Sequence, residues 1–237
     1  MRAILQAGGV GSRLRPYTIT VPKPLMPVSD MPILEVVMRQ LARKGFRDIT
    51  ITVGHLAHLI EAFFGNGSKF GVNIDYVVED KPLGTVGAAS VVEGLAEPFL
   101  VMNGDLLTDI DYGEFMRDHV ASGAPMSVGV YRKEIPISLG VIEFDGDFHV
   151  TSFAEKPVKK YWVSMGVYAM NTGMLEHIPA GEYCGFDTLM ERVIREKLPV
   201  RVVPFDGIWL DIGRHEDYED ATRVFEENRD KFLGPGG

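Results

Sequence analysis

Three glycines near the amino terminus form the first group of residues that could bind a ligand. Gly8, Gly9 and Gly11 precede Arg13, directly after a short apolar run at residues 3–6. Glycines let the backbone approach a ligand closely and let amide groups point at phosphate oxygens. The arginine adds a permanent positive charge to the same loop. The composition is that of a phosphate-binding loop, and a tight turn after a strand is the alternative interpretation.

Two common phosphate-binding loops do not match this stretch. A mononucleotide-binding loop ends in Gly-Lys followed by Ser or Thr, and the chain contains no Gly-Lys pair. A dinucleotide-binding fingerprint needs a third glycine at the position of Leu14. The sequence therefore disfavours a nicotinamide-dependent reductase.

A lysine between two prolines is the second candidate. Lys23 stands between Pro22 and Pro24. Each proline ring fixes its own φ and restricts the residue before it, so this lysine loses little freedom when it binds an anion. A solvated lysine in a proline turn is the alternative.

Two aspartates follow predicted strands. Asp105 ends an Asn-Gly-Asp stretch directly after the apolar run 99–102, and Asp211 follows Leu210. In open α/β sheets, ligands collect at the carboxyl ends of the strands. Magnesium takes few carboxylates and completes its shell with water and phosphate oxygens. Spacing alone does not pair these two acids, because more than a hundred residues separate them.

The residues from 8 to 28 carry a family signature. They read Gly-Gly-x-Gly-Ser-Arg-Leu-x-Pro-x-Thr-x-x-x-Pro-Lys-Pro-Leu-x-Pro-Val. This string resembles the signature of the sugar-nucleotide pyrophosphorylases, nucleotidyltransferases that join a nucleoside triphosphate to a sugar 1-phosphate. Within that family it is most similar to the compact mannose- and heptose-1-phosphate guanylyltransferases. The resemblance continues through Pro82-Leu83-Gly84-Thr85, Asn103-Gly104-Asp105, Glu155-Lys156-Pro157 and Trp209-Leu210-Asp211-Ile212-Gly213.

The resemblance implies a role for each of these motifs. It assigns Asp105 and Asp211 to a Mg²⁺ cofactor. It assigns the sugar 1-phosphate to residues of the second half, which are Gly140, Glu155, Lys156 and Ser164. Nucleotide binding falls to Gly8, Gly9, Gly11, Glu79, Gly84 and Thr85.

Charge neutralisation should dominate the chemistry, because both reactants are strongly anionic. The sugar phosphate is already a nucleophile at neutral pH, so positioning matters more than acid–base catalysis. We expect Arg13 to bind the β and γ phosphates and the leaving group. Lys23 is expected to bind the α-phosphoryl oxygens as charge builds there.

Glu79 bears on the choice of base. Thymidylyl and uridylyl enzymes of the family tend to carry glutamine at this position. An ionised carboxylate only accepts hydrogen bonds, and guanine offers two adjacent donors, whereas uracil and thymine offer one donor beside acceptors. Glu79 therefore favours GTP, and a surface glutamate that never touches the base is the alternative.

The sugar is less certain, because the chain departs from the family where the sugar pocket is built. Ser164-Met165-Gly166 replaces a common Asn-Ala-Gly tripeptide and resembles the adenylyl enzymes that act on glucose 1-phosphate, and Leu139 replaces a common tyrosine. Mannose and heptose 1-phosphates are the leading candidates. Uridylyl, thymidylyl or adenylyl transfer to glucose 1-phosphate is the alternative.

Two other functions remain open. A nucleotide-sugar glycosyltransferase would use an Asp-x-Asp metal motif, which Asp109-Ile110-Asp111 matches, but Asp111 is also well placed to cap the helix predicted at 114–119. A non-catalytic nucleotide-sugar-binding subunit would bind the product and release no pyrophosphate.

The elements that must position these residues alternate along the first half of the chain. Apolar runs predict strands at 3–6, 49–53, 74–78 and 99–102, and helical spacing predicts helices at 33–41, 56–63 and 84–93. In the second half we expect strands at 126–131, 163–170, 200–204 and 207–210, a hairpin at 141–153, and helices at 189–196 and 216–232. This is an α/β, Rossmann-like, mostly parallel mixed sheet with helices on both faces and an inserted β-hairpin region.

Composition limits the remaining classes. The 237 residues carry a net charge of −9, are 46% hydrophobic and contain one cysteine. We therefore expect a cytoplasmic protein that binds neither nucleic acid nor membrane. The resemblance implies a single nucleotidyltransferase domain over residues 1–237, without the C-terminal β-helix domain of several family branches. Family members are often homo-oligomers, but the sequence identifies no interface.

Overall fold

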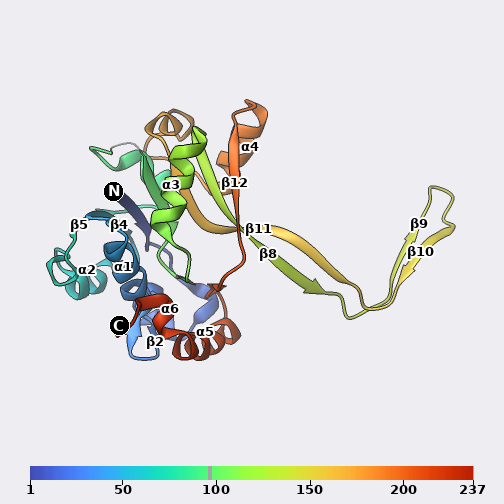
Figure 1. Cartoon of the computed structure of the whole chain (residues 1–237), viewed down its shortest axis with the longest axis horizontal. Coiled ribbons are helices and arrows are strands. Elements are labelled where there is room, and N and C mark those ends of the chain that lie inside the picture. Colours follow the sequence, from blue (N-terminus) through green and yellow to red (C-terminus); the bar gives the residue numbers. More distant parts are fainter. Residues whose placement is uncertain (96–97, 237) are drawn as a thin grey trace.

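A seven-stranded mixed sheet forms the centre of the computed structural model, which describes residues 1–95 and 98–236 (Figure 1). The strand order is β12-β8-β11-β6-β1-β4-β5, and β11 is antiparallel to both its neighbours while the other neighbouring pairs are parallel. The mostly parallel sheet is therefore confirmed. The strands are β1 (Arg2–Gln6), β4 (Asp48–Val53), β5 (Asn73–Val78), β6 (Phe99–Asn103), β8 (Met126–Pro136), β11 (Val158–Met170) and β12 (Val200–Phe205).

Helices cover both faces of this sheet, because successive strand residues point to opposite sides. Ala3 and Leu5 of β1 pack with α1 (Ile33–Arg43), α2 (Ala57–Phe64) and α3 (Tyr112–Ser122). Ile4 packs on the other side with α4 (Phe186–Arg195) and two 3₁₀ segments, Gly87–Val91 and Thr172–His177. The helices predicted at 33–41, 56–63 and 189–196 are thus confirmed.

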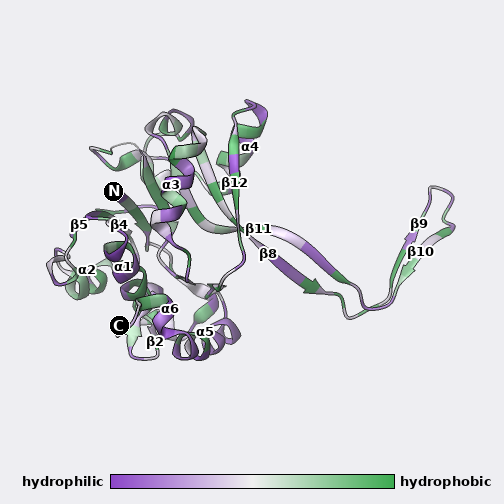
Figure 2. Ribbon diagram, viewed as in Figure 1, coloured by the Kyte–Doolittle hydropathy of each residue, from purple (hydrophilic) through white to green (hydrophobic). Residues whose placement is uncertain are grey.

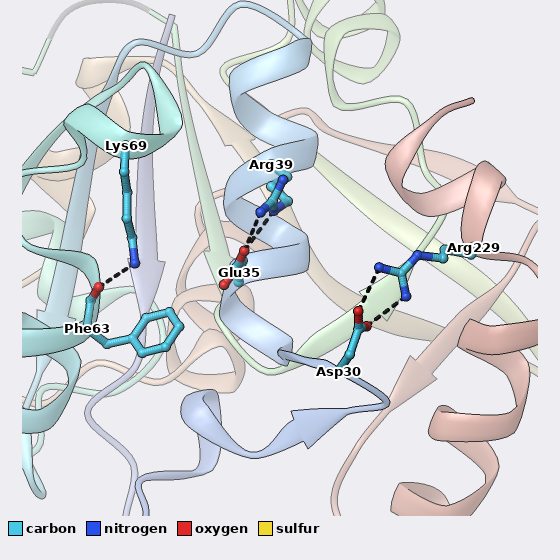
Figure 3. A network of polar contacts seen from close by, with 6 residues as sticks. All are labelled: Asp30, Glu35, Arg39, Phe63, Lys69 and Arg229. Atoms are coloured by element: carbon cyan, nitrogen blue, oxygen red, sulfur yellow. Dashed lines mark hydrogen bonds and ion pairs between the residues drawn. The ribbon is translucent and has the colours of Figure 1, made fainter. Parts of the chain in front are cut away.

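A third apolar cluster joins the carboxyl-terminal helices to the segment that carries Lys23. Helices α5 (His215–Glu227) and α6 (Arg229–Leu233) pack here against β2 (Pro27–Val28), β3 (Met31–Pro32), β7 (Leu106–Thr108) and β13 (Trp209–Asp211). Arg229 donates two hydrogen bonds to Asp30, of 2.7 and 3.0 Å (Figure 3). The same view shows Arg39 paired with Glu35 one turn earlier on α1. The end of the chain therefore holds its amino-terminal loops in place.

A long two-stranded arm leaves the body of the protein (Figure 1). Strands β8 and β11 stay paired well beyond the last buried residues of the sheet, and their tip carries the hairpin of β9 (Val141–Phe144) and β10 (Val150–Ala154). We call residues 132–162 the arm and the remainder the body. The expected hairpin exists, but β8 and β11 are each longer than predicted.

Two predicted helices differ from the structure. The segment 84–93 forms only the short 3₁₀ helix Gly87–Val91, because Gly84 has a φ of +78° and its backbone lies against that of Cys184. The helix predicted at 216–232 is divided at Asn228 into α5 and α6. Within the described part of the chain, no helix is both long and apolar enough to cross a membrane.

Candidate active site

A polar pocket of about 220 Å³ lies where β1 and β6 end. It is lined by both predicted catalytic cations and by Asp105, so the structure brings together residues from three separate motifs. The carboxyl ends of β1 and β6 are adjacent because the two strands pair in parallel, with Gln6 opposite Asn103. The lining residues are Gln6, Ala7, Gly9, Gly11, Ser12, Arg13, Lys23, Pro24 and Asp105.

The glycine loop has a shape that only glycine accepts at one position. Gly11 has a φ of +63°, and a Cβ atom there would lie 2.9 Å from Cγ2 of Thr18. The buried Thr18 hydroxyl donates a hydrogen bond of 2.8 Å to the Gly11 carbonyl. Leu14 is buried among the carboxyl-terminal helices, which fixes the far end of the loop. Arg13 is thereby held at the pocket wall.

Lys23 is a buried cation rather than a solvated turn residue. Its side chain is 10% exposed, and its Nζ lies 2.5 Å from Oδ2 of Asp105 and 4.0 Å from Oδ1 of Asp211. The flanking prolines hold it in a short 3₁₀ turn, Lys23–Leu25. One ammonium group thus serves as counter-ion to both predicted metal ligands.

Asp105 and Asp211 come together through a small antiparallel ribbon. Strand β13 pairs with β7, and Asp211 lies opposite Leu106, the neighbour of Asp105. Burial and the nearby Asp105 carboxylate raise the pKa of Asp211 above its ordinary value, while Lys23 and Arg13 lower it. Oδ1 of Asp105 is buried and has no hydrogen-bond partner. Two close carboxylates with an unpartnered oxygen fit a divalent cation.

We expect the Asp211→Asn variant to raise the melting temperature of the metal-free protein at pH 7 by about 2 °C. Because the pKa of Asp211 is raised in the folded state, ionised Asp211 costs folding free energy, and asparagine removes this cost. The increase in melting temperature is complete above the raised pKa of Asp211. It disappears as the pH falls through that pKa towards the ordinary Asp value. Thermal unfolding in EDTA from pH 4 to 8 measures this. The exposed Asp206→Asn serves as control, and a destabilised Asp211→Asn at pH 7 would contradict the expectation.

Glu79 lies beside the glycine loop, directly after β5. A Cβ atom on Gly8 would lie 3.4 Å from its carboxyl carbon. Oε2 of Glu79 accepts a hydrogen bond of 3.0 Å from the Leu83 amide, while Oε1 is buried without a partner. The carboxylate is therefore held next to the predicted nucleotide loop with one oxygen free to accept a donor.

Gly84 and Thr85 do not line the described pocket. A Cβ atom on Gly84 would lie 2.7 Å from the Cys184 carbonyl oxygen, so this glycine permits a close backbone contact in the fold. Thr85 follows it and is half-buried. The structure shows a packing reason for the glycine, and the nucleotide-binding role of both residues stays a prediction.

The predicted sugar-phosphate residues lie on the arm. Gly140, Glu155 and Lys156 are neighbours there, since a Cβ atom on Gly140 would lie 3.2 Å from Oε2 of Glu155. None of them lines the described pocket of the body. The continued pairing of β8 with β11 past the sheet places them on the arm, and their role in binding the sugar phosphate stays a prediction.

Ser164 lies where the arm joins the body, and it does not line the described pocket either. Its hydroxyl lies 3.0 Å from the Tyr168 hydroxyl, and it lines a separate apolar cavity of about 350 Å³ beside α4. The pairing of β11 with β8 shifts register between Ser164 and Tyr168. Gly166 in this bulge approaches Asn103 so closely that a Cβ atom would lie 2.7 Å from Nδ2.

Two polar pocket residues, Gln6 and Ser12, escaped the sequence argument. Gln6 is the last residue of β1, and Ser12 follows Gly11 in the loop. The rule that ligands bind at the carboxyl ends of strands points to Gln6, since it immediately precedes the glycine stretch.

The Asp-x-Asp stretch has structural partners. Asp111 accepts a hydrogen bond from the Glu114 amide as the cap of α3 and pairs with Lys44. Asp109 accepts a hydrogen bond of 2.7 Å from the Ile208 amide. The predicted capping role of Asp111 is confirmed, and these contacts give no support to a glycosyltransferase metal site.

Comparison with known proteins agrees with this arrangement. Residues 2–228 match the family model described as nucleotidyl transferase. The chain is 32% identical to UTP–glucose-1-phosphate uridylyltransferase of Synechocystis sp. (94% of this chain, 63% of the relative), and 30% identical to mannose-1-phosphate guanylyltransferase catalytic subunit beta of Drosophila pseudoobscura pseudoobscura (99% and 67%). It thus spans about two thirds of the length of these relatives.

A solved structure shares the fold. The crystal structure of HddC from Yersinia pseudotuberculosis complexed with GMP-PN has a TM-score of 0.70 and 25% sequence identity, and the match covers 94% of this chain and 99% of that chain. The motifs, the fold and the match over nearly the whole chain lead to one conclusion. The chain belongs to the nucleotidyl transferase family.

Proposed function

We propose that the protein is a sugar-1-phosphate nucleotidyltransferase, which converts a nucleoside triphosphate and a sugar 1-phosphate into a nucleotide sugar and pyrophosphate. The observation that carries this proposal is that Arg13, Lys23 and Asp105 line one pocket beside a glycine loop, with Asp211 4.0 Å from the Lys23 ammonium group. Two cations and two carboxylates gathered near the ends of β1 and β6 suit a triphosphate and a divalent cation.

The reaction needs positioning and charge neutralisation. A sugar phosphate oxygen attacks the α-phosphorus in line, a new P–O bond forms, and the bond to the β-phosphate breaks with release of pyrophosphate. Arg13 at the pocket wall suits the β and γ phosphates. Lys23, buried and stiffly held, suits the α-phosphoryl oxygens, where a preorganised cation stabilises developing charge most effectively.

The acidic pair would hold Mg²⁺. Asp105 and Asp211 fit such an ion, because one carboxylate has an unpartnered oxygen and the other has a raised pKa that a cation would reverse. The ion would neutralise the phosphates and help to orient them. Lys23, the counter-ion of both carboxylates in this structure, would then be available to bind a phosphate oxygen.

We further propose GTP as the nucleotide and mannose or heptose 1-phosphate as the sugar. Support for GTP comes from the free oxygen of Glu79 beside Gly8, from relatives named as guanylyltransferases, and from a fold neighbour crystallised with GMP-PN. A uridylyltransferase is among the relatives as well. Turnover measured with each nucleotide and each sugar 1-phosphate therefore decides the base and the sugar.

Pyrophosphate release with Mg²⁺, measured for five nucleoside triphosphates against a panel of sugar 1-phosphates, tests the proposal. We expect turnover confined to GTP, with mannose or a heptose 1-phosphate as the best acceptor. Turnover with UTP, dTTP or ATP would support the proposed reaction but contradict the assignment of GTP as the nucleotide. Tight binding of a finished nucleotide sugar without any turnover would favour a non-catalytic binding subunit.

Replacing Glu79 with glutamine tests the base assignment directly. We expect kcat/KM for GTP to fall on the order of 10²-fold, because one acceptor of the two guanine donors becomes an amide donor. Activity with UTP and dTTP should rise relative to GTP in the same assay. Asp80→Asn, which changes an exposed neighbour, is the control. An unchanged nucleotide preference in Glu79→Gln would remove Glu79 from base recognition.

A further inference from the structure

The arm carries half of the proposed site. Gly140, Glu155 and Lys156 lie together where the tip hairpin meets the β8–β11 ribbon. The body carries the other half around Arg13, Lys23 and Asp105. Under the proposed function both halves serve one reaction, so they must meet around one pair of substrates.

The ribbon keeps the two halves of one chain apart. Lys156 lies beyond the start of β11, and within that strand Val158 lies five residues before the half-buried Val163, which corresponds to about 17 Å at roughly 3.3 Å per residue. Across this distance the ribbon is paired from Val163 opposite Tyr131 to Val158 opposite Pro136, and Ile137 donates a further hydrogen bond of 3.0 Å to Pro157.

Within the ribbon, neither strand contains a glycine between residues 131 and 136 or between 158 and 163, and Lys160 pairs with Glu134 across it at 2.5 Å. The register shift between Ser164 and Tyr168 lies at the base of the ribbon, so the ribbon leaves the sheet as one paired unit. In this structure the tip of the arm therefore lies away from the body (Figure 1).

The arm is rich in exposed large hydrophobic side chains. Ten of the 22 exposed large hydrophobic side chains among the described residues lie on the arm, although the arm makes up only 31 positions of the chain. Figure 2 shows hydrophobic stretches among hydrophilic ones on the arm. The ten side chains are Ile135, Leu139, Ile142, Phe144, Phe148, Val150, Phe153, Val158, Tyr161 and Trp162. Clustered apolar exposure of this kind is typical of a surface that contacts another protein.

The rim of the body pocket offers a matching surface. Val10 lies between the two pocket glycines Gly9 and Gly11 and is 46% exposed. Tyr17, Ile19 and Val21 follow in the segment that leads to Lys23, and all three are also exposed. This apolar rim adjoins the cations that the sugar phosphate must approach.

We propose that two copies of this chain exchange arms, so that Gly140, Glu155 and Lys156 of one copy complete the nucleotide pocket of the other. The inference rests on the proposed function. A reciprocal exchange about a two-fold axis completes both sites and covers both arms with one self-complementary interface. Each active site then needs Lys23 from one copy and Lys156 from its partner.

Mixed dimers test this assignment. Lys23→Ala, with an intact arm, and Lys156→Ala, with an intact body, are co-expressed with different affinity tags and purified through both. Each variant alone should be inactive. The mixed dimer should recover about half of the wild-type turnover, because one of its two sites combines an intact body with an intact arm. Arg13→Ala replaces Lys23→Ala if the latter fails to fold.

A matched pair excludes unspecific rescue. In the control, one chain carries Lys23→Ala and its partner carries Asp105→Asn. Both substitutions lie in the body, so neither site of that mixed dimer is intact and turnover should stay absent. If the arm serves its own chain, the Lys23→Ala and Lys156→Ala pair also stays inactive while the wild type turns over. That result overturns the exchange and leaves the proposed function standing.

Sedimentation tests the exchange without turnover. The wild type should sediment as a dimer, and replacing Ile142, Phe144 and Phe153 together with serine should give a folded monomer by circular dichroism. A monomeric wild type, or a dimer that survives the triple substitution, overturns the exchange. A dimer that depends on the arm but shows no turnover with any substrate would count against the proposed function and not against arm docking.

Discussion

The Lys23→Ala variant is expected to lose kcat on the order of 10²–10³-fold, with a smaller rise in KM. Lys23 is a buried ammonium group at the wall of the pocket, held 2.5 Å from Asp105. A cation fixed in this way interacts most strongly with the charge that develops at the α-phosphoryl group. Steady-state pyrophosphate release, at saturating and at limiting nucleoside triphosphate, separates the two parameters. An equal loss of affinity for every ligand with kcat intact would contradict this role.

The loss of Lys23 also removes the counter-ion of a partly buried carboxylate, so stability needs its own control. Removing one member of a buried ion pair destabilises a protein by about 3–5 kcal/mol when both groups are dry, and by less here because Asp105 is 24% exposed. The double variant Lys23→Ala with Asp105→Asn removes both charges. It should recover most of the stability while remaining inactive, which separates unfolding from lost chemistry.

The Asp105→Asn variant is expected to lower kcat/KM by about 10³-fold and to raise the Mg²⁺ concentration needed for half-maximal activity. Asparagine keeps the shape of the side chain but removes the negative charge that a divalent cation requires. Oδ1 of Asp105 is buried without a partner, so no protein group substitutes for the ion at this atom. Magnesium titration of the initial rate, with EDTA-treated enzyme as the zero point, measures the effect.

Asp111→Asn is the matched control for that experiment. Asparagine caps a helix about as well as aspartate, so α3 should remain intact and turnover should stay within about twofold of the wild type. If Asp111→Asn abolished the metal dependence while Asp105→Asn retained it, the metal site would lie at the Asp-x-Asp stretch. The glycosyltransferase interpretation would then gain support.

The two carboxylates and Lys23 form one electrostatic unit. Without a divalent cation, the lysine ammonium lies between Asp105 and Asp211 and offsets part of their repulsion. Burial and the Asp105 carboxylate still raise the pKa of Asp211, so Lys23 and Arg13 do not fully offset them. The same close charges that cost folding free energy would favour binding of a cation, which is the usual relation between stability and function at such sites.

Local patterns determined much of the fold. Ile33, Val36 and Val37 lie on the buried face of α1 at helical spacing, and the predicted strand positions of β1, β4, β5 and β6 are all present. Predictions failed where neighbours in space decided the outcome. Gly84 is fixed by the Cys184 backbone a hundred positions away, and the strands of the arm extend because each supplies the other with hydrogen-bond partners. Neither contact is visible in a local pattern.

The sequence by itself identified the candidate phosphate-binding residues of the site. The glycine loop and Lys23, which stands between two prolines, are local features whose conformation depends on adjacent residues. Only the tertiary structure joined Asp105 to Asp211, through the pairing of β7 with β13, since strand pairing over such a separation leaves no trace in spacing. The tertiary structure likewise separated Lys156 from Lys23. The reason is that the pairing of β8 with β11 continues beyond the buried part of the sheet, so the tip of the arm lies away from the body (Figure 1).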